Sequence, residues 1–526
     1  MAVGSSMWPR PERCGVLVCT IVMAFIFVGI AAGRCTCIQG LPRSKRTDAS
    51  PATGYFVPGL NKTGWDVLHV VGSPNYTPDQ QMFAAGYVEG FLTAKQISDW
   101  YTNYDANQFH TKPVSDGLRN YLTQQLSWAR AMSEKMKHTS DYWMHVSLIL
   151  QQFDGLVAGY QASLLPHRNL SSFDLYLLNS AGDIEDLANL YPQPGMRRSF
   201  KPEAPLEFTD CSALITLLPK SADLFAGHTT WTDYYSMNRI YKHYSLPLTG
   251  AAAVNISFSS RPGMLSSKDD WYTMSSGLVS LETTNAVYNK SLYANVKPEG
   301  SLLCWQRAML ANRLAKTGKE WTDIFAQHNS GTYNNQWMVV NYNLFQAGRP
   351  LKAGTLHILE QIPGYTMSDD VTHVLASQGY WPSYNVPYFE WIYNISGWTE
   401  MLAKYGDNYS YAKCPRATIF RRPTYNDWQH DPLALNDPAN GISSRYDLRG
   451  DIDKPAFAFG GIDSKATSSA MMINPERNML ALAISGPTHQ QQTPFEWTAK
   501  WEDVHEGQPA LWNFDWVVHD SNANRS

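Results

Sequence analysis

The pattern of the sequence changes once, at Cys211, and this change limits the folds that the chain can adopt. Before Cys211, apolar residues recur every three to four positions over long stretches, which predicts helices. After it, short runs rich in β-branched and aromatic residues alternate with turn signals, which predicts strands. The chain is therefore expected to be an α+β protein that draws most of its helices from the first part and its strands from the second.

The helical part has a clear expected start. Thr77 fits an N-cap, Pro78 the first helical position and Gln80 the third position of a capping box. Gly86 and Gly90 share one face of that helix, where small residues let another element approach closely. Further helices are predicted at 115–137, 139–162, 172–190 and 302–327. Strands are predicted at 213–218, 224–230, 254–259, 277–284, 336–345, 355–361, 418–421, 470–473 and 479–484.

A loop-rich linker, residues 191–210, separates the two parts and ends at the cysteine. Its four prolines and its basic residues mark it as a segment that proteases can reach. If the chain is cut between Asp210 and Cys211, the cysteine gains an α-amine with a pKa of about 8, which can activate its own thiol. One residue then supplies both nucleophile and base, as in N-terminal-nucleophile (Ntn) hydrolases. The alternative is that Cys211 is a small buried hydrophobic residue at the head of a strand.

Several longer motifs lie in a fixed order around this cysteine. They are Asn179-Ser180-Ala181-Gly182-Asp183, Phe208-Thr209-Asp210-Cys211-Ser212, Gly227-His228-Thr229-Thr230-Trp231, Glu282-Thr283-Thr284-Asn285, Asn334-Asn335-Gln336-Trp337, Leu359-Glu360-Gln361-Ile362 and Gly460-Gly461-Ile462-Asp463-Ser464-Lys465. In this order they resemble the phospholipase B-like family of lysosomal and secreted proteins, from about residue 50 to the C-terminus. The resemblance implies an Ntn-hydrolase αββα sandwich, in which two antiparallel sheets lie between helix layers. Residues 34–210, mainly helical, would then supply much of the outer helix layer for a sheet begun by Cys211. Together with residues 211–526, the catalytic fragment, they would form one such unit and stay associated after cleavage.

The resemblance also implies the residues of the active site. Cys211 would be the nucleophile, Asn385 would donate a side-chain hydrogen bond to the oxyanion, and Thr284 would place a hydroxyl near the sulfur. Arg416 resembles an arginine that holds a carboxylate or the thiol in bile-salt-hydrolase-like relatives. Without the resemblance, Asn385 would be a turn residue, Thr284 a strand residue and Arg416 a surface cation.

Two more residues are expected beside the nucleophile. His228 follows Cys211 by 17 positions and is predicted on the partner strand of the first hairpin, where it could orient the thiol or the α-amine. Trp231 could form a wall of the acyl pocket. A buried structural histidine and a core tryptophan are the alternatives. Upstream, Asp183, Glu185 and Asp186 make an acidic helix face that is expected to be solvated or to cap a helix.

The N-terminus and the glycosylation triplets indicate the secretory pathway. Residues 1–33 contain Arg10 and Arg13, then an apolar run that ends in Ala31-Ala32-Gly33, and so read as a cleaved signal peptide or an uncleaved signal-anchor. A lysosomal or secreted location is therefore expected. Cys304 and Cys414 could form a disulfide, although spacing does not establish one. Eight Asn-X-Ser/Thr triplets are headed by Asn61, Asn75, Asn169, Asn255, Asn289, Asn394, Asn408 and Asn524.

Composition and missing motifs exclude several functions. A net charge of -4 without a long basic run argues against nucleic-acid binding. The sequence has no Gly-x-Ser-x-Gly elbow, no zinc-binding His-Glu-x-x-His or Cys-x-x-Cys motif and no Gly-rich nucleotide loop, so no metal or cofactor is expected. The family resemblance then implies a self-processing hydrolase that releases fatty acids from glycerophospholipids and contacts lipid surfaces. Alternatives are an amidase acting on N-acyl substrates and a non-catalytic lipid-binding glycoprotein; the oligomeric state stays open.

Overall fold

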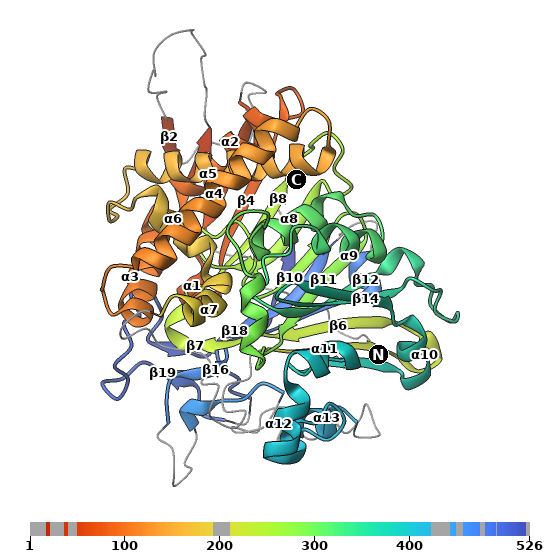
Figure 1. Cartoon of the computed structure of the whole chain (residues 1–526). Coiled ribbons are helices and arrows are strands. Elements are labelled where there is room, and N and C mark those ends of the chain that lie inside the picture. The colour runs from red at the N-terminus through yellow and green to blue at the C-terminus, as the bar shows by residue number, and fades with distance from the viewer. Residues whose placement is uncertain are drawn as a thin grey trace, which may run out of the picture.

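The computed structural model describes residues 50–192, 211–421, 442–448, 456–473, 479–490 and 492–521, together with the backbone of strands at 17–20 and 36–39. Within this part of the chain, helices and strands form an α+β structure with two large sheets (Figure 1). Asp210, linker residues 193–209 and Asn524 lie outside the described residues. So does most of the N-terminal apolar run, and its role as signal peptide or anchor stays a prediction.

The larger sheet has eleven strands and takes them from both sides of the linker. All of its neighbouring strands are antiparallel except β4 and β8, which run parallel. Parallel neighbours need a long crossover, and this one holds helices α2 to α7, the linker and the β5–β6 hairpin. In spatial order the strands are β14 (Tyr365–Asp370), β13 (Leu356–Ile362), β12 (Asn335–Asn341), β11 (Leu278–Thr284), β10 (Trp271–Met274), β9 (Asn255–Ser260), β8 (Ile240–Ser245), β4 (Asp66–Gly72), β3 (Ala52–Val57), β1 (Leu17–Thr20) and β2 (Thr36–Gln39).

The smaller sheet begins directly after Cys211. Its six strands are all antiparallel to their neighbours. In spatial order they are β15 (Tyr380–Ser383), β5 (Ser212–Leu217), β6 (Leu224–Thr229), β17 (Asp463–Ser468), β18 (Leu480–Ser485) and β21 (Val517–Asp520). Two short ribbons accompany it, one of β7 (Trp231–Asp233) with β16 (Phe459–Gly461), the other of β19 (Phe495–Glu496) with β20 (Leu511–Trp512).

Side chains from the two sheets meet between them. On β6, His228 Nε2 lies 2.8 Å from the carbonyl oxygen of Glu282 on β11. The rings of Tyr241 on β8 and His519 on β21 stack with centroids 3.8 Å apart. One face of each sheet is therefore buried against the other, and residues of both belong to one continuous apolar core.

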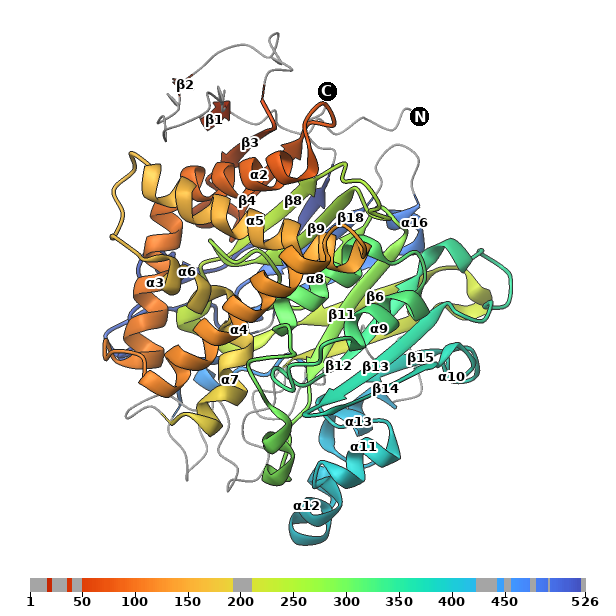
Figure 2. The ribbon, with the colours of Figure 1, turned by 45° about the horizontal axis from the view of Figure 1, so that its top comes forward.

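Most of the long helices cover the opposite face of the larger sheet. Helix α2 packs on β3, β4 and α5, and α9 packs on β12, β13 and β14. Figures 1 and 2 show α2, α4 and α5 gathered in one layer, with α11, α12 and α13 in a separate group at the other end of the molecule. The smaller sheet is contacted by two short helices, α10 on β5 and β15 and α16 on β17 and β18. The helices are α1 (Leu60–Thr63), α2 (Pro78–Leu92), α3 (Ala94–Phe109), α4 (Asp116–Met136), α5 (Asp141–Ala162), α6 (Ser172–Asn179), α7 (Ala181–Leu190), α8 (Cys304–Leu314), α9 (Gly318–Ala326), α10 (Thr372–Gln378), α11 (Glu390–Ile395), α12 (Trp398–Tyr405), α13 (Pro415–Phe420) and α16 (Ser469–Met472).

Local signals in α2 act as the sequence predicts. The Thr77 hydroxyl accepts from Gln80 N, and the Gln80 side chain accepts from Thr77 N, which completes the capping box. Gly86 and Gly90 face α5 so closely that a Cβ added to Gly86 would lie 1.8 Å from the carbonyl oxygen of Gln152. The absence of side chains at these positions lets the two helix backbones touch.

The relation between the first part of the chain and the sheets differs from expectation. The sequence predicts that its helices cover the sheet begun by Cys211, but α2 covers the larger sheet, which also takes β3 and β4 from the first part. A fully buried ion pair reinforces this association: Lys242 Nζ on β8 lies 2.6 Å from Glu89 Oε1 on α2. Tyr244 donates a further hydrogen bond to the same carboxylate. The two parts thus share one sheet and one core.

Four predicted elements are different in the structure. The helix expected at 172–190 breaks at Ser180, because Asn179 is held by hydrogen bonds to Gly263 O and Leu265 N. The helix expected at 302–327 is interrupted between α8 and α9, where Thr317 caps a new N-terminus. The strands expected at 418–421 and 470–473 belong to helices α13 and α16; in the first case, Pro415 at the first helical position favours the helix start.

Cysteines and glycosylation triplets can be placed for most positions. Cys304 and Cys414 are both free and buried, so the disulfide suggested for them is not formed. Asn61, Asn75, Asn169, Asn394 and Asn408 are exposed, as a glycan requires, whereas Asn255 and Asn289 are half-buried. The Asn289 side-chain nitrogen donates to Ile395 O, which competes with glycan attachment there. Among the described residues, no helix combines the length and apolar composition needed to cross a bilayer.

Candidate active site

Cys211 stands at the first position before β5, at the end of the smaller sheet. Its side chain is buried, with 3% of the residue exposed. Its backbone φ is +40°, a left-handed conformation that is uncommon for any residue other than glycine. Such strained backbone persists only where the surroundings hold it, and it is enriched at functional sites.

Arg416 is the residue that holds the surroundings of Cys211 together. Its Nη1 donates to Cys211 O at 2.6 Å and to Ser212 Oγ at 3.0 Å. Its Nη2 donates to Tyr384 O at 2.8 Å and to Asn385 Oδ1 at 2.6 Å. The planar guanidinium thus fixes the start of β5 against the loop after β15. Arg416 is therefore not a surface arginine, because only 6% of it is exposed.

Asn385 is fixed in position by both ends of its amide. Its Oδ1 accepts from Arg416, and its Nδ2 donates to Thr284 O at 2.6 Å. Its φ of +67° is left-handed, which asparagine tolerates better than most residues. Because an amide nitrogen carries two hydrogens, one N–H remains to serve a neighbouring oxygen. The structure therefore brings Asn385, Arg416 and Cys211 together.

Thr284 contributes its backbone to this site. It is half-buried at the end of β11, and its carbonyl oxygen is the acceptor for Asn385. The preceding residue, Thr283, faces the smaller sheet, where its hydroxyl lies 2.6 Å from Ser383 Oγ on β15. This contact joins β11 to the strand that precedes the Asn385 loop, a link that the sequence does not indicate.

His228 and Trp231 lie close together in the sequence, near the end of β6 and at the start of β7. His228 is on β6, the partner strand of β5, as predicted, opposite Ala213 in the register. Its ring bonds to Glu282 O, and burial together with Lys465 holds the pKa of His228 well below its usual value. Burial therefore favours the neutral form of the ring. Trp231 packs under Arg416, whose guanidinium carbon lies 4.9 Å from the ring centroid.

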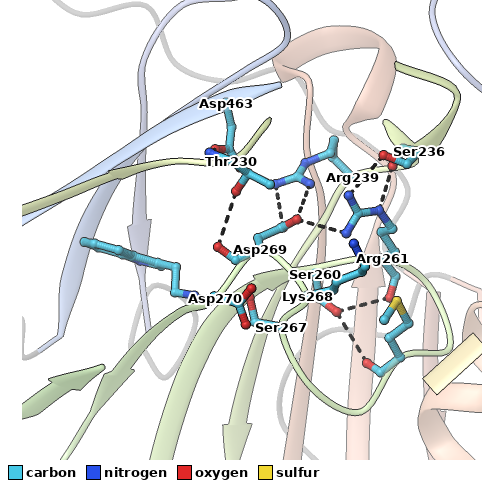
Figure 3. A network of polar contacts seen from close by, with 12 residues as sticks. Thr230, Ser236, Arg239, Ser260, Arg261, Ser267, Lys268, Asp269, Asp270 and Asp463 are labelled. Carbon is cyan, nitrogen blue, oxygen red and sulfur yellow. Dashed lines mark hydrogen bonds and ion pairs between the residues drawn. The ribbon is translucent and has the colours of Figure 1, made fainter. Parts of the chain in front are cut away.

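A buried charge network begins at Thr230, two residues after His228 (Figure 3). The sequence did not point to this network. Asp269 Oδ1 accepts from Arg239 Nη1 at 2.8 Å and from Arg261 Nη1 at 3.0 Å. On β17, Asp463 Oδ1 accepts from Lys465 Nζ at 2.6 Å, and Asp463 also pairs with Arg239. The motif Gly460 to Lys465 was the available signal, but nothing in it names the two arginines. The network joins the ends of the two sheets.

The acidic face of α7 is only partly solvated, because Glu185 and Asp186 are half-buried and Asp183 is buried. Asp183 is 1% exposed, and its carboxylate accepts from Cys304 N at the start of α8 and from Thr332 Oγ1. Asp186 accepts from Asn334 Nδ2 at 3.0 Å. Burial raises the pKa of both carboxyl groups to about 6. Asp183 therefore caps a helix as one alternative predicted, but a helix from the other side of the linker.

Asn335 is a further polar residue that sequence reasoning did not select. It pairs with Thr284 across β11 and β12 and is fully buried. Its side-chain oxygen and nitrogen have no hydrogen-bond partner among the described residues. The only signal for it was its place in the motif Asn334-Asn335-Gln336-Trp337. No group of three or more His, Cys, Asp or Glu side chains suited to a metal ion occurs in the described part of the chain.

Comparisons with known proteins agree with this arrangement of motifs. The family model described as Phospholipase B matches residues 52–519. The chain is 40% identical over 519 residues to Phospholipase B-like protein G of Dictyostelium discoideum, covering 88% of this chain and 85% of that protein. It is 39% identical over 490 residues to Phospholipase B-like 1 of Homo sapiens, covering 89% and 86%. A crystal structure of a mutant conjugated bile acid hydrolase from Clostridium perfringens matches with a TM-score of 0.33 at 11% identity, over 60% of this chain and 93% of that one.

Proposed function

The chain belongs to the phospholipase B family, and from this premise we propose that it is a self-processing cysteine hydrolase of the Ntn type that releases fatty acids from glycerophospholipids. In this proposal the two facing sheets and their helices are an αββα sandwich. Cys211 becomes the N-terminal residue of the large fragment by cleavage of the Asp210–Cys211 bond. The lumen of the lysosome or the exterior of the cell is the proposed site of action.

The observation that carries the proposal is the placement of Arg416. One guanidinium bonds both to the backbone of Cys211 and to the side chain of Asn385. It therefore sets the distance and direction between the proposed nucleophile and the proposed oxyanion donor. A cysteine that served only as core packing would need no buried cation tied to its carbonyl group and to a neighbouring amide.

Self-processing would use the sulfur twice. In the first step the Cys211 thiolate attacks the carbonyl carbon of Asp210, and the peptide C–N bond breaks as the nitrogen takes a proton. The resulting thioester is hydrolysed by water, which releases the Asp210 carboxylate and regenerates the thiol. The free α-amine then stands beside the sulfur as its base. The pairing of β4 with β8, the ion pair of Glu89 with Lys242, and the contact of Asp183 with α8 would keep the two fragments together.

Acyl hydrolysis would follow the same path on an external substrate. The sulfur attacks the ester carbonyl carbon, and the oxyanion that forms is stabilised by the free N–H of Asn385. Such a preorganised donor contributes about 3–4 kcal/mol in related sites. The C–O bond breaks, the alcohol leaves with the proton from the α-ammonium, and water cleaves the thioester to give the fatty acid. Trp231, beneath Arg416, would border the acyl chain.

The substrate class is tested by an acyl-release assay on purified, processed protein. Free fatty acid should appear from phosphatidylcholine vesicles and not from the matched N-acyl amide. Release from the amide alone would replace the ester hydrolase with an amidase. Binding of vesicles without any release from either substrate would leave only a lipid-binding module, and would contradict the proposed function.

Replacing Asn385 tests the oxyanion assignment. Asn385→Gly removes the amide and still accepts the left-handed backbone at φ +67°. It should lower kcat by roughly 10²–10³-fold and change KM little, because the lost hydrogen bond is made mainly in the transition state. The measurement is steady-state kinetics on the processed fraction.

Asn385→Ala is the matched control for this test. It removes the same amide but adds left-handed strain of about 1–2 kcal/mol. If Asn385 is an oxyanion donor, both variants should lose kcat equally. If it is only a turn residue, alanine should reduce stability more than glycine while turnover stays near normal in both.

A further inference from the structure

Two carboxyl groups lie side by side on the helix-facing side of the larger sheet. In the register of β10 and β11, Trp271 pairs with Leu281, so that Asp270 and Glu282 come next to each other one position further on. Both are buried, with 1% and 0% exposed, and their carboxyl groups are hydrogen-bonded. Asp270 also has a left-handed φ of +53°. Two carboxylates in contact resist ionising together.

The surroundings of this pair contain a proton donor and a pocket. The Tyr333 hydroxyl donates to Asp270 Oδ2. Lys268 lies over the Tyr333 ring at 5.6 Å and forms an ion pair with Glu185 of α7 at 2.5 Å. A pocket with space for about one water molecule, lined by Lys268, Asp270 and Tyr333 among others, borders Asp270. The titratable and charged groups that face the pair are Lys268, Asp269 and Tyr272 from the β9–β10 segment, Tyr333 before β12, Asp183 and Glu185 from α7, and Cys304 and Arg307 from α8.

The pair lies directly behind the Cys211 site, with β11 between them. The carbonyl oxygen of Glu282 accepts the hydrogen bond from His228, and two residues on, that of Thr284 accepts from Asn385. The neighbouring Asp269 is the carboxylate of the charge network in Figure 3. Cys211 lies close enough to Tyr333 to interact with it electrostatically. One strand segment, 282–284, therefore carries the carboxyl pair on one side and the site on the other.

We propose that the Asp270–Glu282 pair is a positioning element that restrains the Cys211 nucleophile at neutral pH and releases it in acid. This inference rests on the proposed function, in which Cys211 is the nucleophile. It adds a regulation of that site which the family assignment does not contain.

The sign of the effect follows from the charge of the pair. Burial raises the pKa of Asp270 to about 6, against the opposing effect of its hydrogen bonds to Glu282 and Tyr333. Above that pH Asp270 is ionised, and as pH falls through about 6 it takes up one proton from solvent and loses its charge. A negative charge nearby disfavours the thiolate. Loss of one charge in an acidic lumen therefore favours the reactive form of Cys211.

The test is the rate at which iodoacetamide alkylates Cys211 in the processed protein, followed by mass spectrometry of the N-terminal peptide of the large fragment. Asp270→Asn keeps the shape of the pair but removes the charge of Asp270 at every pH. At pH 7.5 this variant should react on the order of five- to tenfold faster than the wild type. At pH 5 it should match the wild type, because wild-type Asp270 has then lost the same charge.

Two controls separate this effect from damage to the fold. Glu185→Gln removes a nearby carboxylate that forms an ion pair with Lys268. The ratio of its alkylation rate to that of the wild type should be the same at both pH values. Tyr333→Phe keeps both carboxyl groups but removes the hydrogen bond that favours ionised Asp270. The pH at which the alkylation rate changes should therefore be higher than in the wild type. This variant serves where an amide variant does not fold.

The outcomes distinguish the inference from the proposed function. If the alkylation rate of Asp270→Asn relative to the wild type is the same at pH 5 and pH 7.5, and Tyr333→Phe does not shift the pH dependence, the inference is overturned while Cys211 remains the nucleophile. A wild-type Cys211 that reacts no faster than the buried Cys304 at any pH would overturn the proposed function, and the inference with it.

Discussion

Replacement of Cys211 by alanine is expected to leave the chain uncut and to reduce acyl release by at least about 10⁴-fold. The reason is that one sulfur is proposed to attack first the peptide bond before it and then the substrate. The variant should fold, because alanine fills less space at a buried position without adding a polar group. The measurements are gel analysis of the purified protein and fatty-acid release from phosphatidylcholine vesicles.

Two comparisons sharpen this result. Cys211→Ser should still cut itself slowly, since a hydroxyl can make the same acyl shift, but should hydrolyse substrate poorly. Cys414→Ala removes another free, buried cysteine and should keep both activities. Cleavage of Cys211→Ala at the same bond would show that another protease makes the cut, and self-processing would be wrong.

Asp269→Asn is expected to lower the free energy of unfolding by about 3–5 kcal/mol, the largest stability effect that we expect. Burial alone would raise the pKa of Asp269, but Arg239, Arg261 and Lys465 together hold it well below its usual value. Without this charge, three buried cations face the single carboxylate of Asp463. The ends of the two sheets would then be joined by groups that repel one another.

Denaturant-induced unfolding, followed by tryptophan fluorescence, measures this effect. Asp323→Asn is the matched control, because it removes an aspartate that pairs with Lys319 at 2.7 Å on the surface. It should cost less than about 1 kcal/mol. Equal, small effects of the two substitutions would mean that the buried network does not hold the sheets together.

Features set by local chemistry were predictable from the sequence. The capping box at Thr77 depends on residues within one helical turn, and the hairpin that places His228 opposite β5 depends on a short loop. Gly86 and Gly90 revealed a close contact, because only a nearby backbone explains two small residues on one helix face. The motif residues Cys211, Asn385 and Arg416 were found by resemblance, and the structure brings these three together.

Features that depend on contacts between distant residues were not predictable. Asp183 looked solvated because its neighbours in the sequence are acidic, but it is buried against a helix that begins 121 residues later. The parallel pairing of β4 with β8 needs a crossover whose path no local pattern reveals. Likewise, Asp270 and Glu282 are separated in the sequence and become a pair only through the register of two strands.

N-terminal sequencing of the mature large fragment tests the central claim most directly. Protein purified from the acidic compartment, or matured in vitro at acidic pH, should contain a fragment that begins Cys211-Ser212-Ala213-Leu214-Ile215 and remains bound to the first part of the chain. The same preparation should release fatty acid from phosphatidylcholine vesicles. A single chain with an intact Asp210–Cys211 bond and full acyl-releasing activity would contradict the account.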